Sequence, residues 1–561
     1  MAFQLSPGVN VSEVDLTTVV PSVLTTAGAV AGQFQWGPVN KRISVDSEIT
    51  LVNRFGKPNG NTYTSFFTAS GFLSYGNNLK VVRAANTASR NASEKGSISV
   101  LNEDVFEVTY LHQNNANTYG AYIARYQGAL GNTISVSVAD SASYDAWEFK
   151  GYFSTAPGTS EQAIAAGASD DELHIIVIDE GGVLTGTQGS ILEQFAYVSK
   201  GSDALDALGN SNYYKNVLFN QSKYVYAIDP PDYGNTHATW GNTLASTSFA
   251  TLSTAYQGYM INGSDEAVQD SDIINAYSLF VNPDEVDVSL VMAGDATVPV
   301  QQHIIDNIVT VRKDCVATIS PPSASVINNA GNEVTDITSW TANLARSTSY
   351  AIADSGWKYV FDKYNNVYRW VPLNGDIAGL CVYTDYVRDA WFSPAGINRG
   401  NIKNAVKLAW NPVQSERDAI YSLGVNPVIT LAGSGTVLFG DKTLQTKPSN
   451  FDRINVRRLF IVLEKTIAQA ARSSMFEFND DFTRSQFVAL ITPFLRDVQG
   501  RRGIYDFRVV CDTTNNTPQV IDSNQFVGDI YIKPARSINY IQLNFVSVRT
   551  GVDFTEVVGK F

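Results

Sequence analysis

The spacing of apolar residues near the start of the chain predicts an extended arm. After Ser-Pro-Gly at 6–8, the stretch VNVSEVD places valines among polar residues at strand-like intervals. This segment is short, and no neighbouring pattern offers it an apolar surface. Residues 1–20 are therefore expected to be an arm that needs a partner.

Residues 21–85 alternate strand-like and helical patterns. SVLTTAGAVAGQF predicts a strand whose small residues allow other backbone to approach closely. TYTSFFTASGFLSYG predicts an amphipathic helix that a glycine ends, and LKVVRAA (79–85) has the apolar centre of a strand inside an α/β sheet. Between the two strands, SEITLVNRFG predicts a short helix capped by Ser47, with a buried face made of Ile49, Val52 and Phe55.

The middle of the chain has a different character. Residues 86–205 are rich in Ser, Ala, Asn and Gly, with short strands such as TISVSV and ELHIIVID between turns, which predicts a mainly β domain. Residues 206–345 mix strands with helices, among them SDIINAYSLF, capped by Ser271, which predicts an α/β domain. Both are expected to be outer domains inserted into a core.

The α/β pattern returns in residues 346–525. The longest predicted helix covers 451–475, and a second begins at a capping Asp481 and contains Pro493, which either kinks or divides it. The core face of the first helix is predicted to consist of Val456, Leu459, Phe460, Leu463, Ile467, Ala470 and Ala471.

The last part of the chain, residues 526–561, is expected to form strands and a second arm, with Ile541, Leu543 and Phe545 on one face. The predicted fold is therefore a mixed α/β, multidomain protein. Its inner scaffold is made of residues 21–85 and 346–525, and the insert between them points outward.

Composition and charge exclude several classes of function. The 561 residues carry 40 basic and 54 acidic side chains, a net charge of -14 without a basic block, which argues against direct binding of nucleic acid. No run of eighteen apolar residues is present, so we expect no membrane insertion, and the N-terminus lacks the pattern of a signal peptide. Cys315, Cys381 and Cys511 are far apart, so buried reduced thiols are expected.

The sequence offers no defensible catalytic site. The four histidines lack metal-ligand spacing, and no nucleophile, metalloprotease, Walker or dinucleotide motif is present. The loop in SLVMAGDA stands where α/β folds bind ligands, but it lacks a phosphate-binding glycine pattern. LAGSGTVLFG predicts a hairpin turn. We expect no enzyme activity, cofactor or metal. Arg457, Arg458, Arg501 and Arg502 have two interpretations of similar weight: contacts with a partner's carboxylates, or solvated helix ends.

Several stretches together resemble the contractile tail sheath proteins of T4-like bacteriophages. SPGVNVSEVD, AGQFQWGPVNKRISVDSEITLVNRFGKP and GFLSYGNNLKVVRAA are similar to the family's N-terminal arm and first α/β unit, and GALGNTISVSV to a strand entry found in many sheath proteins. LAWNPVQSERDAIYSLGVNPVITLAGSGTVLFGDKTL, INVRRLFIVLEKTI and GDIYIKPARSINYIQLNFVSV resemble its core and terminal strands. The resemblance covers about 1–85 and 346–561.

The resemblance implies a structural subunit of a virion, synthesised in the host cytoplasm. Subunits would form hexameric rings stacked into a helical sheath, with the tail tube, baseplate and tail terminator as further partners. Contraction by rigid-body rearrangement would drive the tube through the host envelope. The arms would add strands to neighbouring subunits through Pro7, Gly8, Val9, Val11, Val14, Ile541, Leu543 and Phe545, and Arg457, Arg458, Arg501 and Arg502 would be inner-face contacts. Two alternatives stay open: another virion assembly protein, such as a tube or capsid component, and an α/β enzyme.

Overall fold

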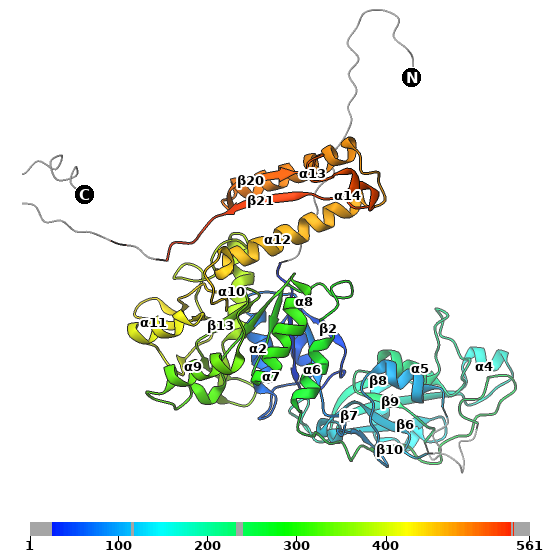
Figure 1. The fold of residues 1–561 in the computed structure, drawn as a ribbon. Helices are drawn as coiled ribbons and strands as arrows, with labels where there is room; N and C mark the ends of the chain where they lie inside the picture. Colours follow the sequence, from blue (N-terminus) through cyan, green and yellow to red (C-terminus); the bar gives the residue numbers. More distant parts are fainter. Residues whose placement is uncertain (1–24, 114–116, 232–238, 540–541, 543–561) are drawn as a thin grey trace, which may run out of the picture.

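A seven-stranded sheet lies at the centre of the computed structural model, which describes residues 25–113, 117–231, 239–539 and 542 (Figure 1). Its strand order is β17-β13-β12-β11-β1-β3-β2, and all neighbours are parallel except β2 and β3. The strands are β1 (Gly28–Gln33), β2 (Arg42–Val45), β3 (Leu79–Ala84), β11 (Leu290–Met292), β12 (Val316–Ile319), β13 (Ala351–Asp354) and β17 (Val425–Asn426).

Helices cover both faces of this sheet, because successive strand residues point to opposite sides. Val30 joins one apolar cluster, whereas its neighbours Ala29 and Ala31 join the other. The small residues of β1 allow a close approach, but by a side chain and not by backbone as predicted: a Cβ on Gly28 would lie 2.5 Å from the ring of Phe72. The helical segments of the core are α1 (Glu48–Phe55), α2 (Tyr63–Leu73), α6 (Asp270–Ser278), α7 (Val298–His303), η5 (Ile304–Val309), α8 (Thr310–Arg312), η6 (Ser323–Ser325), α9 (Glu333–Leu344), α10 (Asn374–Val387) and α11 (Gln414–Ser422).

Details of two helices differ from the prediction. Ser47 caps α1 as expected, but Ile49 is 74% exposed and the buried residues are Leu51 and Phe55, which lie one turn apart on the same face. Helix α6 is capped by Gln269, with Asp272 bonding back to the cap, so Ser271 is not the cap.

Two small antiparallel sheets complete the core. One is β15-β14-β16, formed by β14 (Trp357–Asp362), β15 (Val367–Pro372) and β16 (Lys407–Leu408). The other is the hairpin of β18 (Val428–Leu431) and β19 (Gly435–Leu438), which confirms the turn predicted in LAGSGTVLFG.

The prediction that residues 206–345 form one outer domain is wrong. Its second half supplies β11 and β12, which lie in the middle of the core sheet because a short, fully buried parallel strand needs partners on both sides. Its first half joins the preceding block: β9 (Val225–Ala227) pairs with β5 (Tyr122–Gln127), and β10 (Tyr256–Tyr259) pairs with β6 (Ile134–Asp140). The insert therefore leaves the core after β3 and returns before α6. Where the insert leaves and re-enters the core, Arg90 and Ser264 exchange two backbone hydrogen bonds.

The insert is mainly β, as predicted for 86–205, and lies to one side of the core (Figure 1). Its antiparallel sheets are β4-β5-β9 and β10-β6-β7-β8. The strands are β4 (Asn91–Ser93), β5 (Tyr122–Gln127), β6 (Ile134–Asp140), β7 (Glu172–Asp179), β8 (Ser190–Ser199), β9 (Val225–Ala227) and β10 (Tyr256–Tyr259). The helical segments are α3 (Glu103–Phe106), η1 (Glu107–Leu111), η2 (Ala129–Thr133), η3 (Tyr144–Ala146), η4 (Glu148–Tyr152), α4 (Glu161–Ala165) and α5 (Tyr214–Gln221).

Residues 454–534 form a further unit on the other side of the core, which helix α12 connects to it (Figure 1). Helices α12 and α13 pack on the hairpin β20–β21 through one apolar cluster, so the predicted boundary at 525 falls inside this unit. Asp480, not Asp481, caps α13, and Pro493 lies within a helix that continues to Gly500. The short η7 (Asn450–Asp452) precedes this unit, whose elements are α12 (Ile454–Ala471), η8 (Arg472–Ser474), α13 (Asp481–Gly500), β20 (Ile504–Val510), α14 (Pro518–Asp522) and β21 (Asp529–Pro534).

Candidate assembly site

At the start of the described chain, Thr25 bonds to a buried ion pair between Asp385 and Arg458. We call these three residues the N-terminal root. Asp385 accepts hydrogen bonds from Thr25 Oγ1 at 2.6 Å and from Arg458 Nη1 and Nη2 at 2.8 and 2.6 Å. Both charged side chains are less than 10% exposed. Burial alone would lower the pKa of Arg458, but the Asp385 carboxylate raises it, so the guanidinium stays charged. Thr25, the first described residue, is thus bonded to a carboxylate that this two-pronged contact holds in place.

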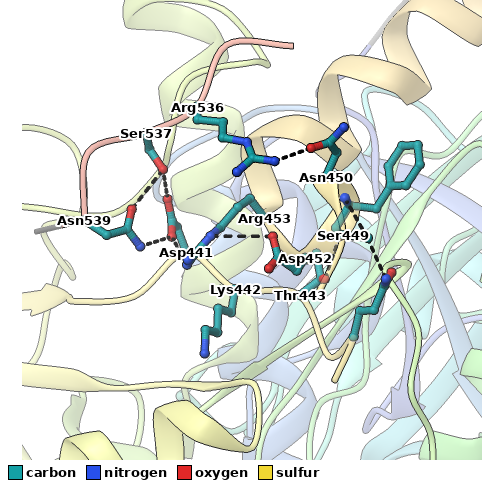
Figure 2. Close-up of polar contacts among 12 residues, drawn as sticks. Asp441, Lys442, Thr443, Ser449, Asn450, Asp452, Arg453, Arg536, Ser537 and Asn539 are labelled. Carbon is teal, nitrogen blue, oxygen red and sulfur yellow. Dashed lines mark hydrogen bonds and ion pairs between the residues drawn. The ribbon is translucent and has the colours of Figure 1, made fainter. Parts of the chain in front are cut away.

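A second polar cluster, the C-terminal root, holds the other end of the described chain (Figure 2). Asp441 accepts hydrogen bonds from Ser537 Oγ at 2.6 Å and from Asn539 Nδ2 and Arg453 Nη1, each at 3.2 Å. Arg453 and Asn539 also donate to the Tyr421 hydroxyl, at 2.7 and 3.1 Å. Asp441 is 4% exposed. It is therefore a buried acceptor that holds residues 537–539 against the core.

Helix α12 carries the arginine of both roots. Arg453 is its N-cap residue and Arg458 lies five positions further on, a rise of about 7.5 Å along the axis. The two ends of the described chain are therefore linked to the first turns of one helix through the carboxylates of Asp385 and Asp441, and that helix continues into the C-terminal unit.

The hairpin in this unit is a two-stranded sheet with open edges. Within the described part of the chain, β20 and β21 pair only with each other. Phe507 and Ile532 face the apolar cluster under α13, whereas Tyr505 and Tyr531 are 68% and 61% exposed. An open edge presents unpaired N–H and C=O groups, to which another strand can add.

Two of the four predicted inner-face arginines are buried inside the subunit. Arg457 lies between the rings of Tyr350 and Phe451, at 4.3 and 4.1 Å from their centroids, and burial lowers its pKa. Arg458 is the arginine of the N-terminal root. Neither is a solvated helix end, and neither is free to meet a partner's carboxylate, because helix α12 turns both toward the core.

The other two arginines lie at the surface where α13 ends. Arg501 is about half-exposed, pairs with Asp389 and lies 5.3 Å above the Trp391 ring. Arg502 is exposed and has a φ of 67°. Their contact with a partner stays a prediction. The predicted arm residues Pro7, Gly8, Val9, Val11, Val14, Ile541, Leu543 and Phe545 lie outside the described residues.

The place where a doubly wound sheet would bind a ligand is filled by the protein itself. Beyond the carboxyl ends of β11, β12 and β13, Asn374 exchanges hydrogen bonds of 2.8 and 3.0 Å with the backbone of Gly294. It also donates to Ser320 Oγ, which donates to Asp354 at 2.7 Å. Burial raises the pKa of Asp354 to about 8. The first turn of α10 thus closes this crevice.

The described residues contain neither a helix long and apolar enough to cross a membrane nor a cluster of three His, Cys, Asp or Glu side chains suited to a metal.

Sequence reasoning missed the residues that form the two roots. Thr25 and Asp385 are 360 positions apart, Arg458 and Asp385 are 73 apart, and Ser537 and Asp441 are 96 apart. Only Arg458 was singled out, together with Arg457 in INVRRLFIVLEKTI, and for a contact outside the subunit. The other members of the roots are polar residues that no local pattern marks.

Comparison with known proteins identifies the family. Residues 267–444 match the phage tail sheath protein central domain, and residues 446–547 match the phage tail sheath C-terminal domain. The tail sheath proteins of Vibrio phage KVP40 and Enterobacteria phage T4 are each 33% identical to this chain, with 99% of this chain covered and 100% and 99% of theirs. That of Salmonella phage ViI is 31% identical, with 99% and 98% covered.

Solved structures of sheath proteins share the fold. The sheath of the PVC extracellular contractile injection system, in its contracted state, aligns with a TM-score of 0.51 at 13% identity, covering 99% of this chain and 100% of that one. The sheath tail protein of Desulfitobacterium hafniense aligns with a TM-score of 0.51 at 12% identity, covering 94% and 100%. With near-complete relatives at about one-third identity, this chain belongs to the bacteriophage tail sheath protein family and is a structural subunit of a contractile tail sheath.

Proposed function

We propose that this subunit polymerises helically around a tail tube by exchanging its two terminal arms with neighbouring copies. The observation that carries the proposal is the link of both ends of the described chain to helix α12, through Asp385 and Asp441, beside a hairpin whose two edges are open among the described residues. A strand from a neighbour can complete such a sheet through backbone hydrogen bonds. The alternating sequence of residues 9–14 and the strand pattern around 541–545 suit that role.

Anchored roots suit a contractile lattice. Arms that leave from buried ion pairs transmit force to the core instead of peeling away from the subunit. The subunits can then rotate as rigid bodies while the arms keep them joined, and contacts between unlike surfaces build an open helix.

Contraction is driven by the difference between two packings of the subunit. If the contracted lattice is more stable by only a few kcal/mol per copy, on the order of packing differences that separate bistable states, many copies together supply the work. We infer a location in the virion after synthesis in the host cytoplasm, stacked hexameric rings, and contacts with tube, baseplate and terminator. No catalytic step is part of this mechanism.

Deletion of residues 1–15 tests the proposal. We expect the variant to keep the thermal unfolding profile of the full chain but to form no ordered sheath on tubes in negative-stain electron micrographs. A matched variant, with residues 1–15 replaced by a flexible Gly/Ser segment of equal length, separates loss of the strand from loss of length, and it should fail as well. Ordered sheath from either variant contradicts the arm exchange.

A further inference from the structure

The turn between α12 and α13 displays a cluster of large apolar side chains, which we call the tip patch: Met475, Phe476, Phe478 and Phe482, with Glu477 and Asp481. Phe476 is fully exposed, and Phe478 and Phe482 are 84% and 75% exposed. Four large exposed apolar side chains within eight residues are more than the single scattered ones that a soluble surface normally carries, and such a cluster indicates an interaction site.

The tip patch is held in position. Asn479, in its middle, donates hydrogen bonds to Gln525 O at 2.8 Å and Asn516 Oδ1 at 3.1 Å, and Asp480 caps α13. Phe476 has a φ of 69°, a left-handed conformation that is unfavourable for a bulky residue. A strained, exposed aromatic on a fixed turn indicates a function outside the subunit.

The charges within the tip patch are acidic, and the exposed Arg472 just before it pairs with Asp284 at 3.9 Å. Glu477 and Asp481 are exposed, and the positive partner of Asp481, Arg484, is buried beneath it. A matching surface therefore combines apolar side chains with positive charge.

The end of α10 and the loop after it provide such a surface, the collar patch: Tyr386, Val387, Arg388, Ile397 and Arg399. Tyr386, Val387 and Ile397 are 60%, 47% and 55% exposed. Burial and the nearby Arg388 charge lower the pKa of Arg399. In the described ranges, no carboxylate forms an ion pair with either arginine. Arg388 is exposed, whereas Arg399 is half-buried over the Phe392 ring and donates from Nε to Ser393 O at 2.9 Å, so the positive charge offered to a partner is mainly that of Arg388.

The two patches cannot meet within one subunit. The collar patch begins beside Asp385, which holds Arg458 near the start of α12, whereas the tip patch follows the end of α12. The 18 residues of that helix separate them by about 27 Å. We propose that the tip patch of one copy docks on the collar patch of another. This rests on the proposed function and names one surface pair of the polymer. A contact between unlike patches repeats from copy to copy and builds a ring or an open helix, the two arrangements that a stacked helical sheath combines.

Charge reversal tests the pairing on the full chain, with and without isolated tail tubes, by sedimentation and electron microscopy. Glu477→Lys and Arg388→Glu should each raise the protein concentration needed for sheath formation roughly tenfold, and the double variant should restore it. Glu148→Lys, an exposed reversal on the insert, is the matched control and should assemble like the parent chain.

Phe476→Gly separates assembly from folding. Glycine adopts the left-handed conformation without strain, so we expect the subunit's unfolding temperature to be unchanged or higher while sheath formation weakens.

Normal assembly by both single reversals overturns the pairing. The pairing is also overturned if the double variant stays defective and, of the two single variants, only Glu477→Lys loses binding to tubes. In that case the tip patch docks on the tube and not on another copy. A parent chain that forms no sheath under any condition overturns the proposed function itself, and this inference with it.

Discussion

Arg458 and Asp385 form a buried ion pair with N–O distances of 2.6 and 2.8 Å, and Thr25 adds a third hydrogen bond to the same carboxylate. Arg458 lies on α12, the helix that connects the core to the C-terminal unit, and Thr25 is the first described residue. The ion pair therefore links the two. A subunit pulled by its N-terminal arm is therefore loaded through this contact.

Loss of the arginine should destabilise the subunit strongly. Arg458→Met leaves Asp385 buried without its partner, which costs about 3–5 kcal/mol of unfolding free energy. Urea unfolding measures the loss. The double variant Arg458→Met, Asp385→Asn should recover a large part of it, because no unpaired charge remains. A single variant as stable as the parent would show that the pair does not hold the root.

Removal of the acceptor at the other root should free the outgoing chain. Asp441→Ala takes away the common partner of Ser537, Asn539 and Arg453. Local opening then becomes easier, so trypsin should cut after Arg536 faster than in the parent chain. Mass spectrometry identifies the cut, and cleavage after Arg502 is the internal control. Equal rates at Arg536 in both proteins would contradict the anchoring role.

Arg83 should couple the insert to the core. Its guanidinium donates to Phe34 O, Gly37 O and, in the insert, Gln127 O, at 2.9, 2.8 and 2.8 Å. Burial lowers the pKa of Arg83 to about 10, so it remains charged at neutral pH.

Arg83→Lys cannot reach all three acceptors, and each buried carbonyl left without a donor costs about 1–3 kcal/mol. We expect faster hydrogen exchange in segments 34–40 and 121–128. Arg90→Lys, whose bonds go to Thr87 O and Ser89 O, is the control and should leave these segments protected. Unchanged exchange in the Arg83 variant would mean that the insert is held by other contacts.

Asp354 should make the subunit less stable as the pH rises. Burial raises its pKa from 3.8 to about 8, so the folded state favours the protonated acid. The unfolded chain ionises near pH 4, and the folded one only near pH 8; stability from this group is therefore present below about pH 4 and is lost progressively up to about pH 8. Asp354→Asn should show a flatter dependence of the urea midpoint on pH between 5 and 8. Parallel curves for the two proteins would contradict the buried protonated state.

The local sequence patterns predicted most helices and strands, because the spacing of apolar residues along the chain shows which face of an element is buried. Val30 and Val81 lie in buried strands as expected, and the apolar spacing of α12 places Leu459 and Leu463 in the core. The placement of β11 and β12 could not be predicted, because β1 ends at Gln33 and β11 begins only at Leu290, with the insert between them, and the sequence does not say which sheet a buried strand joins. The prediction that Arg457 and Arg458 are inner-face contacts was wrong for a related reason. Their aromatic and carboxylate partners come from distant segments of the sequence.

The central claim is that arms rooted on α12 join neighbouring subunits at the β20–β21 hairpin. The most direct measurement is a helical reconstruction of the assembled sheath by cryo-electron microscopy, at a resolution that traces the backbone. We predict added strands along the open edges of the hairpin that continue, through Thr25 or Asn539, into other copies. A hairpin whose edges stay unpaired, or pair with the arms of its own subunit, would contradict the account.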